Sequence, residues 1–145
     1  MILLDTNVLS ALMRDPPDAA VVRWLDGQDP GRVWTTAVSA FEVRFGLARL
    51  TEGRRRAALE AAFAALLRED LAGRVAPLDR AAADAAGLLA AQREAAGRTV
   101  DVRDTLIAGI ALARRAAVAT RNVRHYADLH TEVVDPWVAD LGRDG

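Results

Sequence analysis

The hydrophobic residues of this chain form short unbroken runs that alternate with longer amphipathic segments. The first run, residues 2–4, contains no polar residue and leads directly into Asp5. Unbroken apolar runs of this length fit strands covered on both faces, as in parallel sheets flanked by helices. Four later segments, at residues 32–36, 74–78, 116–120 and 132–134, are less purely apolar but are also predicted to be short strands. The pattern therefore predicts five short strands.

The segments between these runs have the spacing of helices. We expect helices over residues 8–13, 18–27, 37–50, 54–68, 80–96 and 102–114. In the third of these, Phe41, Phe45 and Ala48 are predicted to form the buried stripe. Strands that alternate with helices imply right-handed crossovers and a mostly parallel sheet. The chain is thus expected to adopt an α/β fold.

Length and composition predict one globular domain over residues 1–145, with a frayed tail after about Asp140. Of the residues, 52% are hydrophobic and 27% charged, and no apolar run approaches the roughly 18 residues of a membrane span. The run at residues 2–4 is too short for the core of a signal peptide. Because the chain has no Cys, it lacks disulfides and thiolate metal sites. We expect a cytoplasmic protein without a membrane segment.

The basic residues are unusual because all 19 are Arg. Without Lys, a P-loop lysine and a Schiff-base lysine are excluded. Because Cys is also absent, any metal ion must be held by oxygen atoms or by His. Arg suits bidentate contacts to phosphate. The net charge of −1 gives no global attraction to nucleic acid, and three Trp, three Phe and one Tyr are few for the base-stacking sheets of RNA-binding domains.

Three acidic residues stand near predicted helix starts, and each has a structural explanation of its own. Asp5, or Thr6 beside it, can N-cap the first helix. Glu42 follows Ser39 at the spacing of a capping box. Asp104 follows Asp101 at the same spacing, so Asp101 is a natural N-cap and Asp104 is favoured by the helix dipole.

Capping does not explain why all three helix starts present carboxylates toward one edge of a parallel sheet. The carboxyl ends of such strands are where ligands bind in α/β proteins. An edge lined by Asp5, Glu42 and Asp104 repels itself unless cations lie there. Hard divalent ions such as Mg²⁺ or Mn²⁺ prefer carboxylate oxygens, so the set as a whole favours a metal site.

Four motifs, in order, resemble the PIN-domain family, specifically the VapC/FitB-type toxins of bacterial toxin–antitoxin pairs. They are ILLDTN at residues 2–7, SAFE at 39–42 with Gly46, DTLIA at 104–108 and ATRN at 119–122. The closing VVDPW at residues 133–137 is also similar. The resemblance covers essentially the whole chain and implies a three-layer α/β/α fold with a small parallel sheet and a Mg²⁺-dependent ribonuclease.

The resemblance also implies roles for individual residues. Asp5, Glu42 and Asp104 correspond to the acids that hold the metal. Asn122 stands at a fourth position that is acidic in many members, and it completes the catalytic set here. Because an amide binds Mg²⁺ more weakly than a carboxylate, whether one or two ions bind stays open. A further departure is His125-Tyr126, where relatives often have Asp-Phe.

Neighbouring residues are expected to assist this site. Thr6, Asn7, Asp101 and Thr120 are assigned supporting roles around the acids. The arginines next to motif residues, Arg44, Arg121 and Arg124, are candidates for contacting RNA. The resemblance further implies a DNA-binding antitoxin as partner and a homodimer, for which the Ala-rich helices at 54–68 and 80–96 offer smooth faces.

Three other hypotheses remain open. A metal-free ribonuclease would need an acid–base pair from His125 and His130, of which His125 is expected at the surface. A phospho-acceptor switch at Asp5 is disfavoured, because such proteins need a Lys, and phosphatases of this kind also need an acid where Asn7 stands. A catalytically weak PIN module that mainly binds an antitoxin stays possible because of Asn122.

Overall fold

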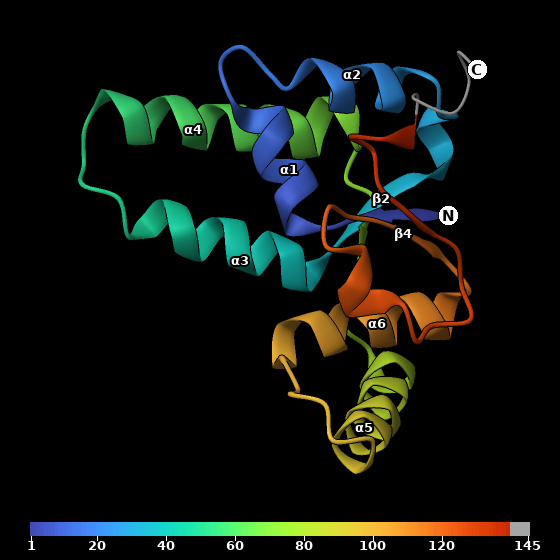
Figure 1. The fold of residues 1–145 in the computed structure, drawn as a ribbon. Coiled ribbons are helices and arrows are strands. Elements are labelled where there is room, and N and C mark those ends of the chain that lie inside the picture. The colour runs from blue at the N-terminus through green and yellow to red at the C-terminus, as the bar shows by residue number, and fades with distance from the viewer. Residues whose placement is uncertain (140–145) are drawn as a thin grey trace.

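The sheet has five strands in the order β3-β2-β1-β4-β5, and every pairing is parallel (Figure 1). This computed structural model describes residues 1–139, so the frayed tail predicted after about Asp140 lies outside the described residues. The strands are β1 (Ile2–Leu4), β2 (Val33–Thr36), β3 (Val75–Ala76), β4 (Ala117–Ala119) and β5 (Val133–Val134). The predicted parallel sheet is confirmed.

Helices cover both faces of the sheet, which gives three α/β/α layers (Figure 1). They are α1 (Thr6–Met13), α2 (Ala19–Asp26), α3 (Ala37–Ala48), α4 (Arg54–Ala65), α5 (Arg80–Ala95) and α6 (Val102–Arg114), with short turns η1 (Pro30–Arg32), η2 (Leu66–Asp70) and η3 (Val123–Tyr126). Successive residues of a strand point to opposite faces. Ile2 and Leu4 accordingly join the core under α1, α2 and α4, while Leu3 joins the core under α5 and α6.

The strand register brings the carboxyl ends of the central strands level with one another. Leu4 pairs with Thr35 of β2 and with Ala119 of β4, and the amide of Asp5 continues the ladder to the Ala119 carbonyl at 2.9 Å. Helix α6 precedes β4 and runs in the opposite direction, so its first turn lies at this same edge. The topology therefore places the starts of α1, α3 and α6 together.

The exposed face of α3 differs from the prediction. Phe41 is 59% exposed and Phe45 is 46% exposed, and Ala48 is also exposed, so the predicted buried stripe is wrong. Helix α3 carries a second apolar stripe that includes Val43 and Leu47, and this aliphatic stripe packs in the core beside α1. Periodicity alone cannot decide between two apolar stripes on one helix.

Helices α5 and α6 pack unusually closely at Gly109. A Cβ atom added there would lie 2.5 Å from the carbonyl oxygen of Ala82 and 2.6 Å from Cβ of Ala86. Part of the smooth face of the Ala-rich helix α5 is therefore used inside the chain. In the part of the chain that the structure describes, no helix is both long and apolar enough to cross a membrane.

We expect Gly109→Ala to lower the free energy of unfolding by about 1–3 kcal/mol, because the added methyl group forces two helix backbones apart. Denaturant unfolding followed by circular dichroism measures this change. Gly87→Ala in α5 is the matched control. A Cβ at Gly87 meets no atom within 4 Å, so this substitution should leave the protein as stable or up to about 1 kcal/mol more stable. Equal effects at both positions would contradict the packing argument.

Candidate functional site

Asp5 is a buried carboxylate that follows the central strand, and its residue is only 4% exposed. Its Oδ1 accepts a hydrogen bond from the Thr6 amide at 2.8 Å. Asp5 is therefore the N-cap of α1, one of the two N-caps that the sequence predicts for this helix. Its Oδ2 accepts from the Thr120 hydroxyl at 2.7 Å and from the Tyr126 hydroxyl at 3.4 Å. The carboxylate is therefore held from three directions.

Glu42 is not part of a capping box. Helix α3 begins at Ala37, and its N-cap is Thr36, whose hydroxyl accepts from the Ser39 amide at 3.0 Å. This places Glu42 in the second turn, beyond reach of the role that its spacing from Ser39 suggested. Its side chain is 18% exposed, and its nearest cation is Arg103 at 3.8 Å. Glu42 therefore has no capping function that would account for a carboxylate here.

Asp104 lies in the first turn of α6, as predicted. Its amide donates to Oδ1 of Asp101 at 3.1 Å, which confirms Asp101 as the N-cap of that helix. The Asp104 side chain is 19% exposed, and its Oδ2 contacts Nδ1 of His125. The hydroxyl of Thr105, the next residue, donates to the Asp101 carbonyl at 2.7 Å and reinforces the turn.

The three carboxylates act on one another electrostatically. Burial raises the pKa of Asp5; hydrogen bonds from Thr120 and Thr6 oppose this rise and the charge of Asp104 adds to it. Burial also raises the pKa of Glu42, with Asp5 and Asp104 adding to the rise. At both groups the folded state binds protons more tightly than the unfolded state. The free energy of unfolding therefore falls as the pH rises from the ordinary pKa to the raised one. A cation beside these carboxylates would offset that loss.

Thr120 is the hub that connects the neighbouring turns to Asp5. This fully buried residue directly follows β4. Besides donating to Asp5, its hydroxyl accepts from Nδ2 of Asn7 at 3.3 Å and from the Asn122 amide at 3.0 Å. Oδ1 of Asn7 accepts from the Arg121 amide at 3.1 Å. Asn7 and Thr120 thus fix the turn after β4 relative to β1.

The sequence model described as "PIN domain" matches residues 2–128. The chain belongs to the PIN-domain family. Among curated PIN relatives, the VapC ribonuclease Y4jK of Sinorhizobium fredii is 36% identical over 137 residues, which cover 94% of this chain and 98% of that protein. Toxin FitB of Neisseria gonorrhoeae is 31% identical over 137 residues, 94% of this chain and 99% of that protein.

Solved PIN structures share the same fold. The structure of FitAB bound to the IR36 DNA fragment has a TM-score of 0.84 at 31% identity, covering 94% of this chain and 96% of that chain. FitAcB from Neisseria gonorrhoeae gives a TM-score of 0.80 at 31% identity, covering 94% and 99%. These similarities confirm the three-layer architecture and the family inferred from the four motifs.

Asn122 and the three arginines expected to contact RNA lie in different surroundings. Asn122 follows β4 at the same edge, and its side chain is exposed. The guanidinium of Arg121 stacks over the Trp137 ring at 4.7 Å, and Arg124 is exposed on η3. Arg44 instead pairs with Glu60 of α4 at 3.3 Å. Among the described residues, Arg44 is thus the one of the three arginines expected to contact RNA that forms an ion pair.

Two site residues were not identified from the sequence pattern. Tyr126 is fully buried and donates to Asp5 although 121 positions separate them. Burial and the charge of Asp5 raise the pKa of Tyr126, so its hydroxyl stays protonated as a donor. His125 is exposed, as expected for a surface residue, and its Nδ1 contacts Oδ2 of Asp104, which the sequence did not indicate. The sequence feature that could have indicated both residues is the dipeptide His125-Tyr126, which stands where relatives often have Asp-Phe.

Arg93 is a third residue that the sequence did not reveal. It is 5% exposed, and its guanidinium donates to both carboxylate oxygens of Asp128 at 2.9 Å. It also donates to the Thr105 hydroxyl at 3.1 Å and to the His125 carbonyl at 2.8 Å. Arg93 thus ties α5 to the first turn of α6 and to η3, the two segments that carry Asp104 and His125.

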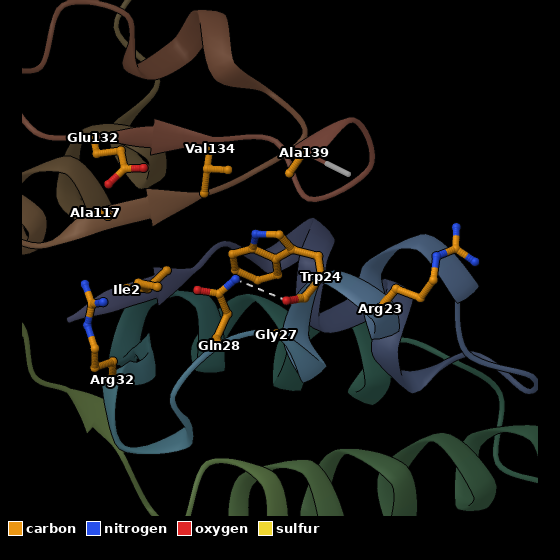
Figure 2. A pocket seen from close by; sticks show the side chains of 10 residues that line it. All are labelled: Ile2, Arg23, Trp24, Gly27, Gln28, Arg32, Ala117, Glu132, Val134 and Ala139. Atoms are coloured by element: carbon orange, nitrogen blue, oxygen red, sulfur yellow. Dashed lines mark hydrogen bonds between the residues drawn. The ribbon is translucent and has the colours of Figure 1, made fainter. Parts of the chain in front are cut away.

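The cavities of the molecule differ in their chemistry. One of about 200 Å³ is lined by Arg93, Arg98, Thr99, Asp101, Asp104 and His125, and so opens beside one of the three acids. Another, of about 280 Å³, lies between α2 and the beginnings of β1 and β4, where Gln28 donates to the Trp24 carbonyl at 3.1 Å (Figure 2). Of the described residues that line this second cavity, Glu132 alone is acidic, so Asp5, Glu42 and Asp104 do not contribute to it.

Proposed function

We propose that this chain is a metal-dependent endoribonuclease and the toxin of a toxin–antitoxin pair. The observation that carries the proposal is the meeting of Asp5, Glu42 and Asp104, from three segments far apart in the sequence, at one edge of the sheet. Their mutual charge effects show in the raised pKa values of Asp5 and Glu42. The names of the relatives, a VapC ribonuclease and toxin FitB, support this reading.

The donor set suits a hard divalent cation, Mg²⁺ or alternatively Mn²⁺. Within residues 1–139, no three Asp, Glu or His side chains stand close enough to hold one ion as they are. Arg103 lies 3.8 Å from Glu42 and partly balances the charge of that carboxylate, and His125 contacts Asp104. The buried Thr6 hydroxyl has no hydrogen-bond partner in the described residues, although it lies near enough to Glu42 to lower the pKa of that carboxyl. We infer that the three acids, with the Thr6 hydroxyl beside Glu42, fit a hydrated ion.

The residues of the chain have distinct tasks in this proposal. Asp5, Glu42 and Asp104 would hold the ion, which when bound activates water and offsets the charge of the scissile phosphate. Thr120 and Tyr126 fix the orientation of the Asp5 carboxylate by donating to it. Asn122 contributes an uncharged amide at the rim, and Arg121 and Arg124 offer positive charge for the RNA backbone.

The partner follows from the structural relatives. The FitAB structure is a complex with DNA, and the VapBC-1 structure from nontypeable Haemophilus influenzae is 25% identical to this chain. We expect an antitoxin that covers the acidic edge and binds DNA. A homodimer of this chain is part of the same proposal.

Removing divalent metal should abolish cleavage of single-stranded RNA. The purified chain is incubated with a 5′-labelled RNA in excess EDTA, and then with Mg²⁺ or Mn²⁺ restored. We expect no cleavage in EDTA, and recovery with either ion to give fragments with 5′-phosphate ends. Full cleavage in EDTA would reject the metal mechanism and favour acid–base catalysis through His125. Absence of cleavage under all conditions, with RNA and antitoxin still bound, would favour the binding-module alternative.

A further inference from the structure

The solvent-exposed side of α3 carries an aromatic stack that the proposed chemistry does not use. The rings of Phe41 and Phe45 lie with centroids 6.0 Å apart and planes at 14°. The guanidinium of Arg49 lies 5.3 Å from the centroid of the Phe45 ring. The three residues follow one another at four-residue intervals, so they lie along one side of the helix over about 12 Å.

This stack begins at the acidic edge. Phe41 directly precedes Glu42 on α3, and Phe45 and Arg49 lead away from it toward the loop that joins α3 to α4 (Figure 1). A chain bound along the stack would therefore pass next to Glu42. A single exposed apolar side chain is common on protein surfaces. A group of adjacent exposed aromatic rings surrounded by polar residues is more typical of an interaction site.

The charge around the stack favours a polyanion. Residues 44–56 contain five Arg and one Glu, although the whole chain has a net charge of −1. Arg44 and Arg56 both pair with Glu60. Arg49, Arg54 and Arg55 are exposed, and within residues 1–139 none of them has an ion-pair partner. This segment is thus a basic patch that adjoins flat aromatic surface.

We infer that Phe41, Phe45 and Arg49 form a platform on which the bases of single-stranded RNA stack as the strand leaves the acidic edge. Every base has a π-face, so aromatic stacking combined with basic residues binds single strands with little sequence preference. A protein partner is the weaker fit. The five Arg of residues 44–56 match the phosphates of a nucleic-acid strand better than they match a mixed protein surface.

The platform rests on the proposed function for its substrate class, and its test measures binding without cleavage. A single-stranded RNA containing 2-aminopurine is titrated with the full chain in EDTA, and a gel verifies that the RNA stays intact. Phe41→Leu and Phe45→Leu keep apolar bulk but remove the ring. Each should weaken binding about tenfold and relieve the quenching of 2-aminopurine fluorescence. Phe45→Trp should retain both signals.

Leu88→Ala is the control, because Leu88 is a 68% exposed apolar residue on α5, and it should bind RNA like the parent. Circular dichroism and light scattering accompany each variant. Unchanged RNA affinity in both Leu variants, or no RNA binding by the parent chain, would overturn the platform. So would Leu variants that bind RNA normally but change oligomeric mass or antitoxin affinity, which would assign this face to a protein. If the parent chain failed to cleave RNA but its RNA binding still depended on the Phe rings, the proposed nuclease activity would be rejected and the platform would be supported.

Discussion

We expect Asp5→Asn to lower the rate of RNA cleavage about 10³-fold while the fold stays intact. Metal ions contribute several kcal/mol to such reactions, and each 1.36 kcal/mol is a factor of ten in rate. Asn keeps the shape of Asp and one oxygen, but it removes the charge that attracts a cation. Single-turnover cleavage at saturating Mg²⁺ measures the effect.

The stability of Asp5→Asn separates a catalytic role from a structural one. The pKa of Asp5 is raised by burial, so its charge is unfavourable in the folded state at neutral pH. The loss of this charge should roughly compensate the weakened hydrogen bonds with Thr120 and Tyr126. We therefore expect a free energy of unfolding within about 1 kcal/mol of the parent.

Asp79→Asn is the matched control for Asp5→Asn. Asp79 also N-caps a helix, and its side chain accepts from the Ala82 amide at 3.0 Å. Its ion-pair partner is Arg114, which lies outside the proposed site. Its cleavage rate should equal that of the parent. If Asp5→Asn cleaved RNA as fast as Asp79→Asn, the role proposed for the acidic edge would fail.

Local patterns in the sequence were sufficient for the sheet and for the position of its acids. A three-residue apolar run can be satisfied only where both faces are covered, and a parallel sheet then aligns the ends of its strands. Asp5 and Asp104 also keep the capping arrangements that their spacing predicts. A carboxylate at the start of a helix can therefore belong to the capping arrangement of that helix and still lie beside the other acids at this edge.

The outcome for α3 shows where periodicity stops being informative. Two apolar stripes satisfy the helical repeat equally, and the packing of α1 selects the one with Val43 and Leu47. The aromatic stripe with Phe41 and Phe45 is left exposed. The predicted face was wrong because the aliphatic stripe fills the space beside α1.

The supports of the site could not be predicted because they join distant positions. Arg93 and Asp128 are 35 residues apart, and neither lies in a recognisable motif. A charged residue on a helix is normally exposed, and only the folded chain shows Arg93 to be 5% exposed with its partners around it. The same holds for His125 on Asp104, which are separated by 21 residues.

Arg93→Gln should lower the free energy of unfolding by about 3 kcal/mol, the lower end of the range for breaking a buried ion pair. The lower end applies because Asp128 is 27% exposed and keeps Arg98 at 2.7 Å. Glutamine cannot span Asp128, Thr105 and the His125 carbonyl together. The loop that carries His125 should loosen from α6, so affinity for Mn²⁺ measured by calorimetry should also change.

The control for Arg93→Gln lies on the same helix. Arg80 pairs with Asp84 at 3.0 Å, but their side chains are 89% and 62% exposed. Exposed pairs contribute about 0–1 kcal/mol, so Arg80→Gln should unfold at nearly the parent denaturant concentration. Equal losses for both variants would show that burial and multiple bonding at Arg93 are not what stabilises this corner. A loss confined to Arg93→Gln would show that the buried, multiply bonded guanidinium stabilises this corner of the molecule.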